Sequence, residues 1–321
     1  MPAETTIGQD AAASPDGARD EILIVMNPHS GKKRTGDKAR QLRDQVENHA
    51  GRFVLREVAR GSEIEATVQR GLADGFRTIA AAGGDGTICA VASALAGTGC
   101  RLGVIPLGTF NYFARGNGVP ETVPEAVQML AEAPGRPMDV AEVNGQAFLN
   151  NASLGAYAKV LESRERIYRK YGRSRVAAYW SVFVALRNFR ARLRVTMTVD
   201  GAVHRFKTPM IFVANNPYQL ELFNLAGADL IREGKLVALV APDVGRWGLV
   251  AFAIRLALGG MNRGRDFQLF AGRDIVVETR ARSATVARDG ERGRMRAPFR
   301  FRLHAGALQL VAPPPAPAAA G

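Results

Sequence analysis

Short apolar runs alternate with amphipathic stretches up to residue 106, and this alternation constrains the fold more than any other feature. Four runs have the length and composition of buried strands: 22–26, 53–58, 78–82 and 102–106. Three stretches between them have the spacing of amphipathic helices: 38–50, 64–74 and 88–96. Strands that alternate with helices predict a parallel sheet covered on both faces. We therefore expect a doubly wound α/β domain over residues 21–140.

The pattern becomes β-rich after residue 138. Asp200-Gly201 is typical of a hairpin turn. Two helix candidates interrupt the strands: a basic segment at 159–190 and a second segment at 247–258. We expect a β-rich, sandwich-like domain over 141–292, with a disordered leader at 1–20 and a low-complexity, disordered tail at 313–321. The strand candidates are 138–143, 147–152, 193–200, 203–206, 210–215, 236–240 and 275–279.

Composition narrows the class of partner. The formal net charge is +13 and the isoelectric point about 10.4, which point to nucleic acid, an anionic membrane face or a phosphorylated substrate. Cys89 and Cys100 lack metal-like spacing, so we expect reduced thiols in a cytosolic protein. The N-terminus lacks the order of a signal peptide, and no apolar run approaches the roughly 20 residues that span a bilayer. Any membrane contact is expected to be peripheral.

Glycine-rich turns follow three of the predicted strands. Residues 27–32 follow the first strand, 83–87 the third and 107–109 the fourth. In a doubly wound sheet all three turns lie at the carboxyl edge, where ligands bind. Glycine lets backbone N–H groups approach a phosphate, and the following helix presents its positive end. The turns match neither the GxGxxG fingerprint nor Walker A, which disfavours a dinucleotide dehydrogenase.

Asp85 lies inside the predicted phosphate turn at 83–87. A carboxylate beside a triphosphate is repelled unless a divalent cation lies between them or the carboxylate accepts a proton from the nucleophile. Both roles belong to phosphoryl transfer. No Ser/His/Asp set with motif context occurs, so a hydrolase is not expected.

Three motifs occur in a specific order: Asn27-Pro28-x-Ser30-Gly31, Gly83-Gly84-Asp85-Gly86-Thr87 and Leu107-Gly108-Thr109-x-Asn111-x-Phe113-Ala114. This order resembles the diacylglycerol kinase catalytic superfamily, which includes soluble bacterial lipid kinases and the sphingosine kinases. The resemblance continues through 136–140 and 148–155, ends at Asp289-Gly290-Glu291, and covers residues 21–312. The Gly-Gly-Asp-Gly-Thr motif alone is shared with NAD kinases and phosphofructokinases.

The resemblance implies a site for ATP and Mg²⁺ and a second domain that receives a lipid. Asp289 and Glu291 match the acidic pair near the transferred phosphate, one of which acts as base or reaches the metal, and Asp85 is a further catalytic candidate. Asp139 matches an acidic position linked to the metal, and residues 293–312 are expected to return to the first domain as strands. The matched nucleotide-binding positions are Asn27, Pro28, His29, Ser30, Gly31, Gly83, Gly84, Asp85, Gly86, Thr87, Ile88, Cys89 and Thr109.

Three places depart from the family pattern. Cys89 and Ala90 stand where Asn and Glu are common, and Tyr112 replaces the Asp of an Asn-Asp pair. Arg232-Glu233 replaces an Asp pair that forms a structural magnesium site, and an arginine cannot ligate Mg²⁺. These changes leave open a catalytically weak, nucleotide-binding sensor.

Residues 164–175 are basic with interleaved aromatics, and an apolar run at 179–186 follows. This pattern suits an interfacial helix on anionic lipid, a contact with nucleic acid, or packing on the β-rich domain. We predict ATP-dependent, Mg²⁺-assisted phosphorylation of a lipid hydroxyl, on diacylglycerol or a related lipid, by a cytoplasmic protein peripheral to the inner face of the membrane. The alternatives are an NAD-kinase-like phosphotransferase for a soluble substrate and a non-catalytic sensor or nucleic-acid binder. Nucleic acid is not the expected partner.

Overall fold

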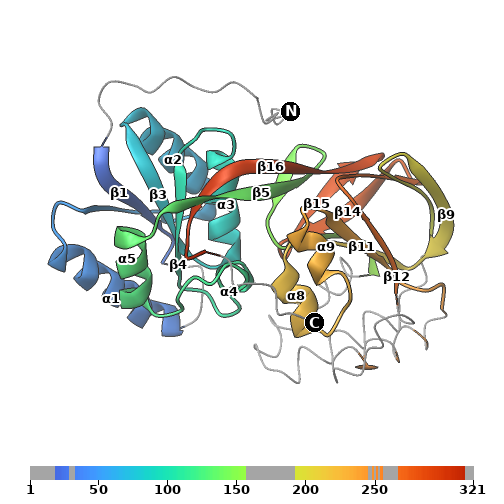
Figure 1. Ribbon diagram of the computed structural model, residues 1–321, viewed down its shortest axis with the longest axis horizontal. Helices are drawn as coiled ribbons and strands as arrows, with labels where there is room; N and C mark the ends of the chain where they lie inside the picture. The colour runs from blue at the N-terminus through green and yellow to red at the C-terminus, as the bar shows by residue number, and fades with distance from the viewer. Residues whose placement is uncertain are drawn as a thin grey trace. The chain divides into compact units, whose positions relative to one another are not determined.

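The structure, a computed structural model, describes residues 19–28, 33–156, 192–244, 248, 251, 254, 255 and 267–314. The chain folds as two compact units (Figure 1). The first unit holds the described residues up to Val140, Gly145–Leu149 and those from His304 onward, and the second holds the rest. The helix candidate at 159–190 lies outside the described residues, as do most of the candidate at 247–258, the leader and the tail.

A parallel sheet forms the centre of the first unit. Its strands run in the order β2-β1-β3-β4, and the end of β16 (Phe299–Val311) lies parallel to β4, with Gln309 opposite Arg101. The predicted α/β class is therefore confirmed. The four strands are β1 (Arg19–Met26), β2 (Phe53–Glu57), β3 (Phe76–Gly83) and β4 (Arg101–Pro106).

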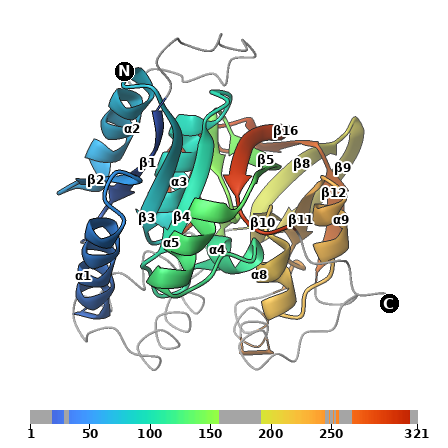
Figure 2. The same ribbon diagram turned by 60° about the vertical axis from the view of Figure 1, so that its left-hand side comes forward.

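Helices cover both faces of this sheet (Figure 2). α1 (Lys33–Asn48) and α5 (Val123–Glu132) pack on the face that carries Ile24. α2 (Ile64–Ala73) and α3 (Asp85–Leu95) pack on the face that carries Leu23. Because neighbouring residues of a strand point to opposite faces and both faces are covered, β1 reads as a continuous apolar run.

Shorter elements of the chain follow the strand ends. η1 (Gly61–Glu63) precedes α2, and α4 (Tyr112–Gly116) follows β4. β5 (Gly135–Val143) and β6 (Gln146–Phe148) are paired strands joined at Asn144-Gly145. The prediction of a single strand over 147–152 is wrong, because the chain leaves β6 after Phe148 and starts β7 (Asn151–Gly155) in another sheet.

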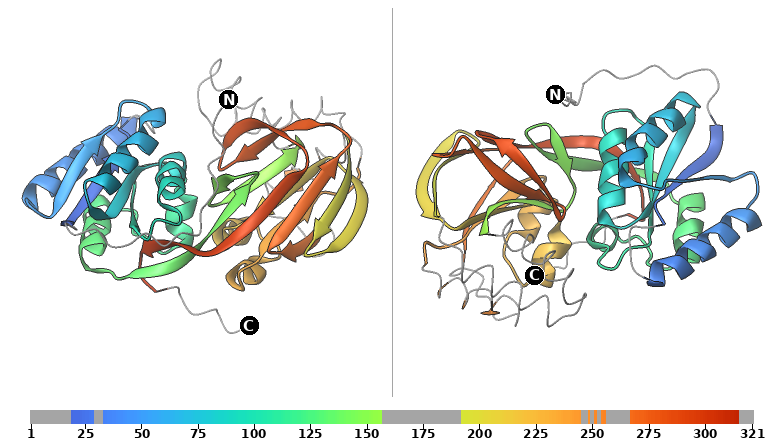
Figure 3. Two further views of the ribbon diagram at one scale, coloured as in Figure 1. Left: turned by 90° about the horizontal axis from the view of Figure 1, so that it is seen from above. Right: turned by 180° about the vertical axis from the view of Figure 1, so that it is seen from behind.

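Antiparallel sheets form the second unit (Figure 3), so the predicted sandwich-like class is confirmed. One sheet has the order β12-β11-β10-β7-β14-β15, and the first half of β16 pairs with β13 in the order β16-β13-β8-β9. α8 (Pro217–Leu222) and α9 (Ala228–Arg232) share an apolar cluster with β10 and β11. The further strands are β8 (Leu193–Val199), β9 (Ala202–Thr208), β10 (Met210–Ala214), β11 (Leu236–Val240), β12 (Gln268–Gly272), β13 (Asp274–Thr279), β14 (Ser283–Arg288) and β15 (Glu291–Arg296).

Three hairpins turn on an Asn-Gly or Asp-Gly pair with positive φ at both residues. The φ angles are 49° and 76° at Asn144-Gly145, 44° and 91° at Asp200-Gly201, and 44° and 88° at Asp289-Gly290. Positive φ at both central residues marks the type I′ turn, which favours Asn or Asp followed by Gly. The turn predicted at Asp200-Gly201 is confirmed.

Candidate active site

The carboxyl edge of the parallel sheet brings the ends of three strands together. The N–H of Asn27 donates to the carbonyl of Ala82 at 3.0 Å, and the N–H of Leu107 donates to the carbonyl of Gly83 at 2.9 Å. The turns after β1, β3 and β4 therefore start side by side. Of the first turn only Asn27 and Pro28 are described; His29, Ser30 and Gly31 lie outside the described residues.

Glycine allows the turns after β3 and β4 to pack backbone against backbone. A Cβ atom placed on Gly108 would lie 2.8 Å from the Cα of Gly84, and one on Gly83 would lie 2.5 Å from the Cβ of Thr87. A side chain at Gly108 would push the two turns apart, and one at Gly83 would displace Thr87 within the β3 turn. This requirement exists without a ligand, so packing alone explains part of the glycine pattern.

The start of α3 has the properties of an anion-binding site. Its N-cap residue, Gly84, offers no side-chain hydrogen bond, and the first N–H groups of a helix have no partner inside it. These N–H groups lie at the positive end of the helix dipole. Thr87 is 4% exposed and Ile88 is fully buried in the core, so Ile88 can contribute only backbone atoms to a ligand. The turn thus fits the phosphates of a nucleotide.

Asp85 ties this turn to α4. Its Oδ1 accepts a hydrogen bond from the N–H of Phe113 at 3.0 Å. One turn further along α3, the Sγ of Cys89 donates to the carbonyl of Ala147 at 3.8 Å, and Ala90 packs against the core. Where the family commonly carries Asn and Glu, this chain therefore uses the two positions for packing toward β6 and the core.

A polar cluster beside the β4 turn was missed by the sequence reasoning. Lys38 of α1 donates from Nζ to the carbonyls of Pro106 and Glu121, at 3.0 Å each. Partial burial acts to raise the pKa of the Glu121 carboxyl, but hydrogen bonds from Arg115 and Asn111 and the charge of Lys38 hold that pKa below its usual value. No local signal could reveal this cluster, since its members lie on α1, at the end of β4, on α4 and in the loop before α5.

In the second unit, Asp289 lies at the tip of the β14–β15 hairpin. Its Oδ1 accepts hydrogen bonds from the N–H groups of Asn150 (2.8 Å) and Asn151 (3.0 Å), and its own N–H donates to the carbonyl of Asn151 (2.9 Å). Glu291, two residues on, is exposed at the start of β15. The turn therefore fixes where the Glu291 side chain leaves the hairpin.

Asn150 and Asn151 belong to a buried amide network that the sequence did not predict. The Nδ2 of Asn216 donates to the Oδ1 of Asn150 at 2.7 Å, and the Nδ2 of Asn151 donates to the Oε1 of Gln219 at 2.8 Å. All four side chains are at most 6% exposed. The network links β7 to the start of α8, so the Asp289 turn is coupled to a helix as well as to a strand.

The described acidic residues do not form a closed metal cage. Asp139 is half-buried in the first unit and accepts a hydrogen bond from the N–H of Gly306 at 2.9 Å. Within the described ranges no three His, Cys, Asp or Glu side chains gather as a metal site. This arrangement fits Mg²⁺ that arrives on nucleotide phosphates and takes one or two carboxylates from the protein, as such ions usually do.

Arg232 stands where the family pattern has an acidic residue. Its guanidinium contacts the carboxylates of Glu221 on α8 and Asp229 on α9. Hydrogen bonding to Glu221 outweighs burial and raises the pKa of Arg232. A single side-chain cation thus bridges two carboxylates of neighbouring helices.

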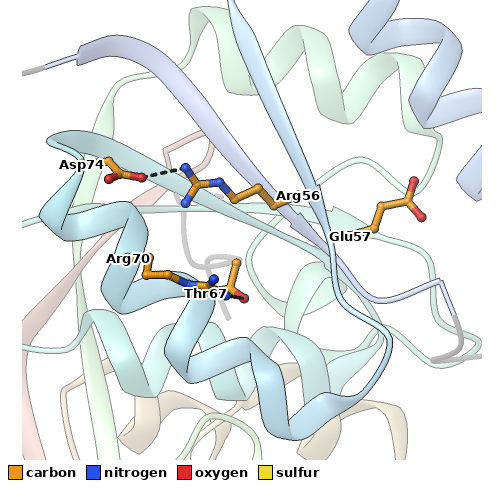
Figure 4. A pocket seen from close by; sticks show the side chains of 5 residues that line it. All are labelled: Arg56, Glu57, Thr67, Arg70 and Asp74. Carbon is orange, nitrogen blue, oxygen red and sulfur yellow. Dashed lines mark hydrogen bonds and ion pairs between the residues drawn. The ribbon is translucent and has the colours of Figure 1, made fainter.

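A cavity of about 390 Å³ opens beside β2 and α2 (Figure 4). Arg56 and Asp74 form an ion pair of 2.6 Å in it, and Arg70 donates to Thr67 on the same helix at 3.3 Å. None of the predicted nucleotide-binding residues lines this cavity. It is therefore not the candidate active site.

Matches to known protein families extend over both units of the chain. Residues 21–143 match the diacylglycerol kinase catalytic domain. Residues 150–312, about half of the chain, match the YegS C-terminal NAD kinase beta sandwich-like domain. The chain belongs to the diacylglycerol kinase catalytic superfamily.

Members of this superfamily resemble the chain in sequence and in fold. A "probable lipid kinase YegS-like" protein from Pseudomonas aeruginosa is 36% identical over 155 residues, 47% of this chain and 50% of its own length. A protein of the same name from Pseudomonas syringae pv. syringae is 43% identical over 110 residues, 34% of this chain and 36% of its own length. The chain thus spans about half the length, or less, of the curated relatives it matches. The crystal structure of a diacylglycerol kinase from Bacillus anthracis strain Sterne covers 92% of this chain and 97% of its own, with 20% identity and a TM-score of 0.66, and so shares the fold.

Proposed function

We propose that the protein transfers the terminal phosphoryl group of ATP to a hydroxyl of a lipid, diacylglycerol or a related lipid. The observation that carries this proposal is the uncapped start of α3 at Gly84, packed against the β4 turn in a chain of the diacylglycerol kinase superfamily. The glycine turn alone supports phosphate binding. The family membership and the names of the sequence relatives support a lipid as the acceptor.

In the proposed reaction the first unit holds the phosphates. The N–H groups at the start of α3 bind the phosphate oxygens, with Thr109 and Asn27 at the neighbouring turns. Asp85 holds this turn in place through its hydrogen bond from Phe113. Asp85 and Asp139 are the carboxylates of the first unit that would contact Mg²⁺ bound to the phosphates. The metal would neutralise charge on the transferred group.

The second unit supplies the acidic hairpin. Asp289 holds the turn through Asn150 and Asn151, and Glu291 projects from it as the general base or as a carboxylate toward the metal. The lipid hydroxyl oxygen forms the new O–P bond, the bond between the β–γ bridging oxygen and the terminal phosphorus breaks, and ADP leaves. The hydroxyl proton passes to the carboxylate.

We further propose that the reaction takes place at the inner, anionic face of the membrane. The formal net charge of +13 favours such a surface. No helix among the described residues is long and apolar enough to span a bilayer. The basic segment at 164–175, to which we assign part of this contact, lies outside the described residues.

Asp85→Asn tests the proposal. The Asn side chain can still accept the hydrogen bond from the N–H of Phe113, but the negative charge of the carboxylate is lost. We therefore expect the transfer of labelled phosphate from ATP to a panel of lipids in vesicles to fall at least about 100-fold. Asp74→Asn is the control, because it removes a carboxylate of the same unit that pairs with Arg56 away from the turns. Equal activity of the Asp85 variant and the wild type would exclude this role.

A second function has one observation in its favour. The matched C-terminal domain carries the description NAD kinase beta sandwich-like. NAD therefore belongs in the panel beside diacylglycerol and a sphingoid base, with products identified by mass spectrometry. Phosphorylation of NAD without phosphorylation of any lipid would replace the lipid-kinase proposal.

A further inference from the structure

A stacked aromatic pair lies directly after Thr109 on the β4 turn. The rings of Phe110 and Tyr112 are 5.5 Å apart between centroids and 8° from parallel. Phe110 is 48% exposed. Among the described residues four large apolar side chains are exposed, and Phe110 is the aromatic one; the others are Val203, Leu222 and Ile254.

The residue between the two rings has a left-handed backbone conformation. Asn111 has a φ of 51°, in the left-handed region, and is 2% exposed. Its carbonyl accepts the N–H of Arg115 at 3.0 Å, and its side chain bonds the carboxylate of Glu121. Asn adopts this conformation more readily than other residues with a side chain, and the two hydrogen bonds hold it here. The cluster around Glu121 therefore fixes the position of the two rings.

The sheet order decides which side of the phosphate turn the pair occupies. In the order β2-β1-β3-β4, the β4 turn lies on the opposite side of the β3 turn from β1. Thr109, the proposed phosphate contact on the β4 turn, is the one farthest from β1 in this order, and the two rings follow it directly, so the group that receives the phosphate would lie next to them. A stacked pair with a half-exposed Phe at that place offers apolar area, with the Tyr hydroxyl as a polar edge.

We propose that Phe110 and Tyr112 form an apolar contact for the lipid substrate, next to its reacting hydroxyl, so that the first unit binds part of the lipid as well as ATP. The inference rests on the proposed lipid-kinase function. The pair would cover the glycerol backbone or the first methylenes of the acyl chains. A role as a stacking platform for the nucleobase is the competing outcome.

The test compares Phe110→Ser/Tyr112→Ser with Phe110→Leu/Tyr112→Leu, which keeps apolar area without the stack. We expect the Ser pair to raise the apparent KM for diacylglycerol about tenfold, because apolar contact area is lost, and the Leu pair to restore most of it. The Kd for ATP should change less than about twofold in both. Val203→Ser is the control, since it removes an exposed apolar side chain on β9 in the second unit.

A rise in the Kd for ATP with an unchanged lipid KM would overturn the proposal in favour of a nucleobase platform. Unchanged values for both ligands would also overturn it and leave the pair a packing role. Sedimentation with vesicles of phosphatidylcholine and diacylglycerol measures lipid binding without catalysis, and so tests this proposal separately from the proposed function. If the wild type phosphorylates no lipid, the function fails. Loss of vesicle binding by the Ser pair then still supports a lipid contact, and equal binding excludes it.

Discussion

The hairpins at Asp200 and Asp289 share their backbone and differ in what they carry. In both, Oδ1 of the aspartate accepts two successive backbone N–H groups, from Arg273 and Asp274 in one hairpin and from Asn150 and Asn151 in the other. In both, the aspartate N–H donates to the carbonyl of the second of those residues. The Asp-Gly turn and its carboxylate clamp are therefore structural chemistry, and by themselves say nothing about catalysis.

Two features separate the hairpins. The residue after the glycine is Ala202 in one and Glu291 in the other. The residues held by Asp289 continue into the buried amide network with Asn216 and Gln219. A functional assignment for the second hairpin therefore depends on Glu291 and on that network, and the Asp200 hairpin is the matched control for both.

The largest expected effect is at Glu291. We expect Glu291→Ala to lower phosphate transfer about 1,000-fold, which corresponds to about 4 kcal/mol, because the proposed base or metal contact is lost. The free energy of unfolding should stay within about 0.5 kcal/mol of the wild type, since the side chain is exposed. Labelled phosphate transfer and urea unfolding measure the two quantities. Wild-type activity of the Glu291→Ala variant would show that the Asp289 hairpin has no catalytic role that the Asp200 hairpin lacks.

The Asp289 clamp should contribute more to stability than the Asp200 clamp. We expect Asp289→Ala to lower the free energy of unfolding by about 2–3 kcal/mol, because it leaves the N–H groups of the buried Asn150 and Asn151 without their acceptor. Asp200→Ala should cost about 1 kcal/mol, because water can replace the carboxylate at this exposed hairpin. Only the Asp289 variant should also lose activity. Urea unfolding of both variants is the measurement, and equal losses would show that burial does not separate the two clamps.

Removing the network should cost less than removing the clamp. Gln219→Leu leaves the Nδ2 of Asn151 without its acceptor in a buried site, and we expect a loss of about 1–2 kcal/mol. A fall in kcat with little change in the KM for ATP would show that the network positions the hairpin. A loss of stability alone would make the network structural, like the surroundings of Asp200.

The smallest effect concerns the glycines. Gly201 and Gly290 have φ of 91° and 88°, and a Cβ atom on either would meet nothing within 4 Å. Alanine at each position should therefore cost about 1 kcal/mol from backbone strain alone. Thermal unfolding of the two variants should give matching shifts, and a larger loss at Gly290 would indicate a steric constraint that the Asp200 turn lacks.

Local patterns predicted the regular parts of the fold well. The apolar runs of β1 to β4 follow from burial on both faces, and β11 was predicted with its bounds because Leu236–Val240 is wholly apolar. β15 was missed, since the sequence Glu291–Arg296 has three arginines and one buried residue, Met295. Its identity as a strand comes from pairing with β14, which a local pattern does not contain.

The sequence by itself determined the order of the glycine-rich turns, the α/β and β-rich halves and the hairpin turn at Asp200-Gly201, because each depends on residues close together in the chain. Only the tertiary structure showed that Lys38 reaches Pro106 and Glu121, that Asp289 holds Asn150 and Asn151, and that Phe110 and Tyr112 stack beside Thr109. The first two are contacts between residues 68 or more positions apart, and the stack depends on the left-handed Asn111 that the cluster around Glu121 holds in place. Long-range hydrogen bonds leave no periodicity in the sequence, and they become visible only once the strands have been paired.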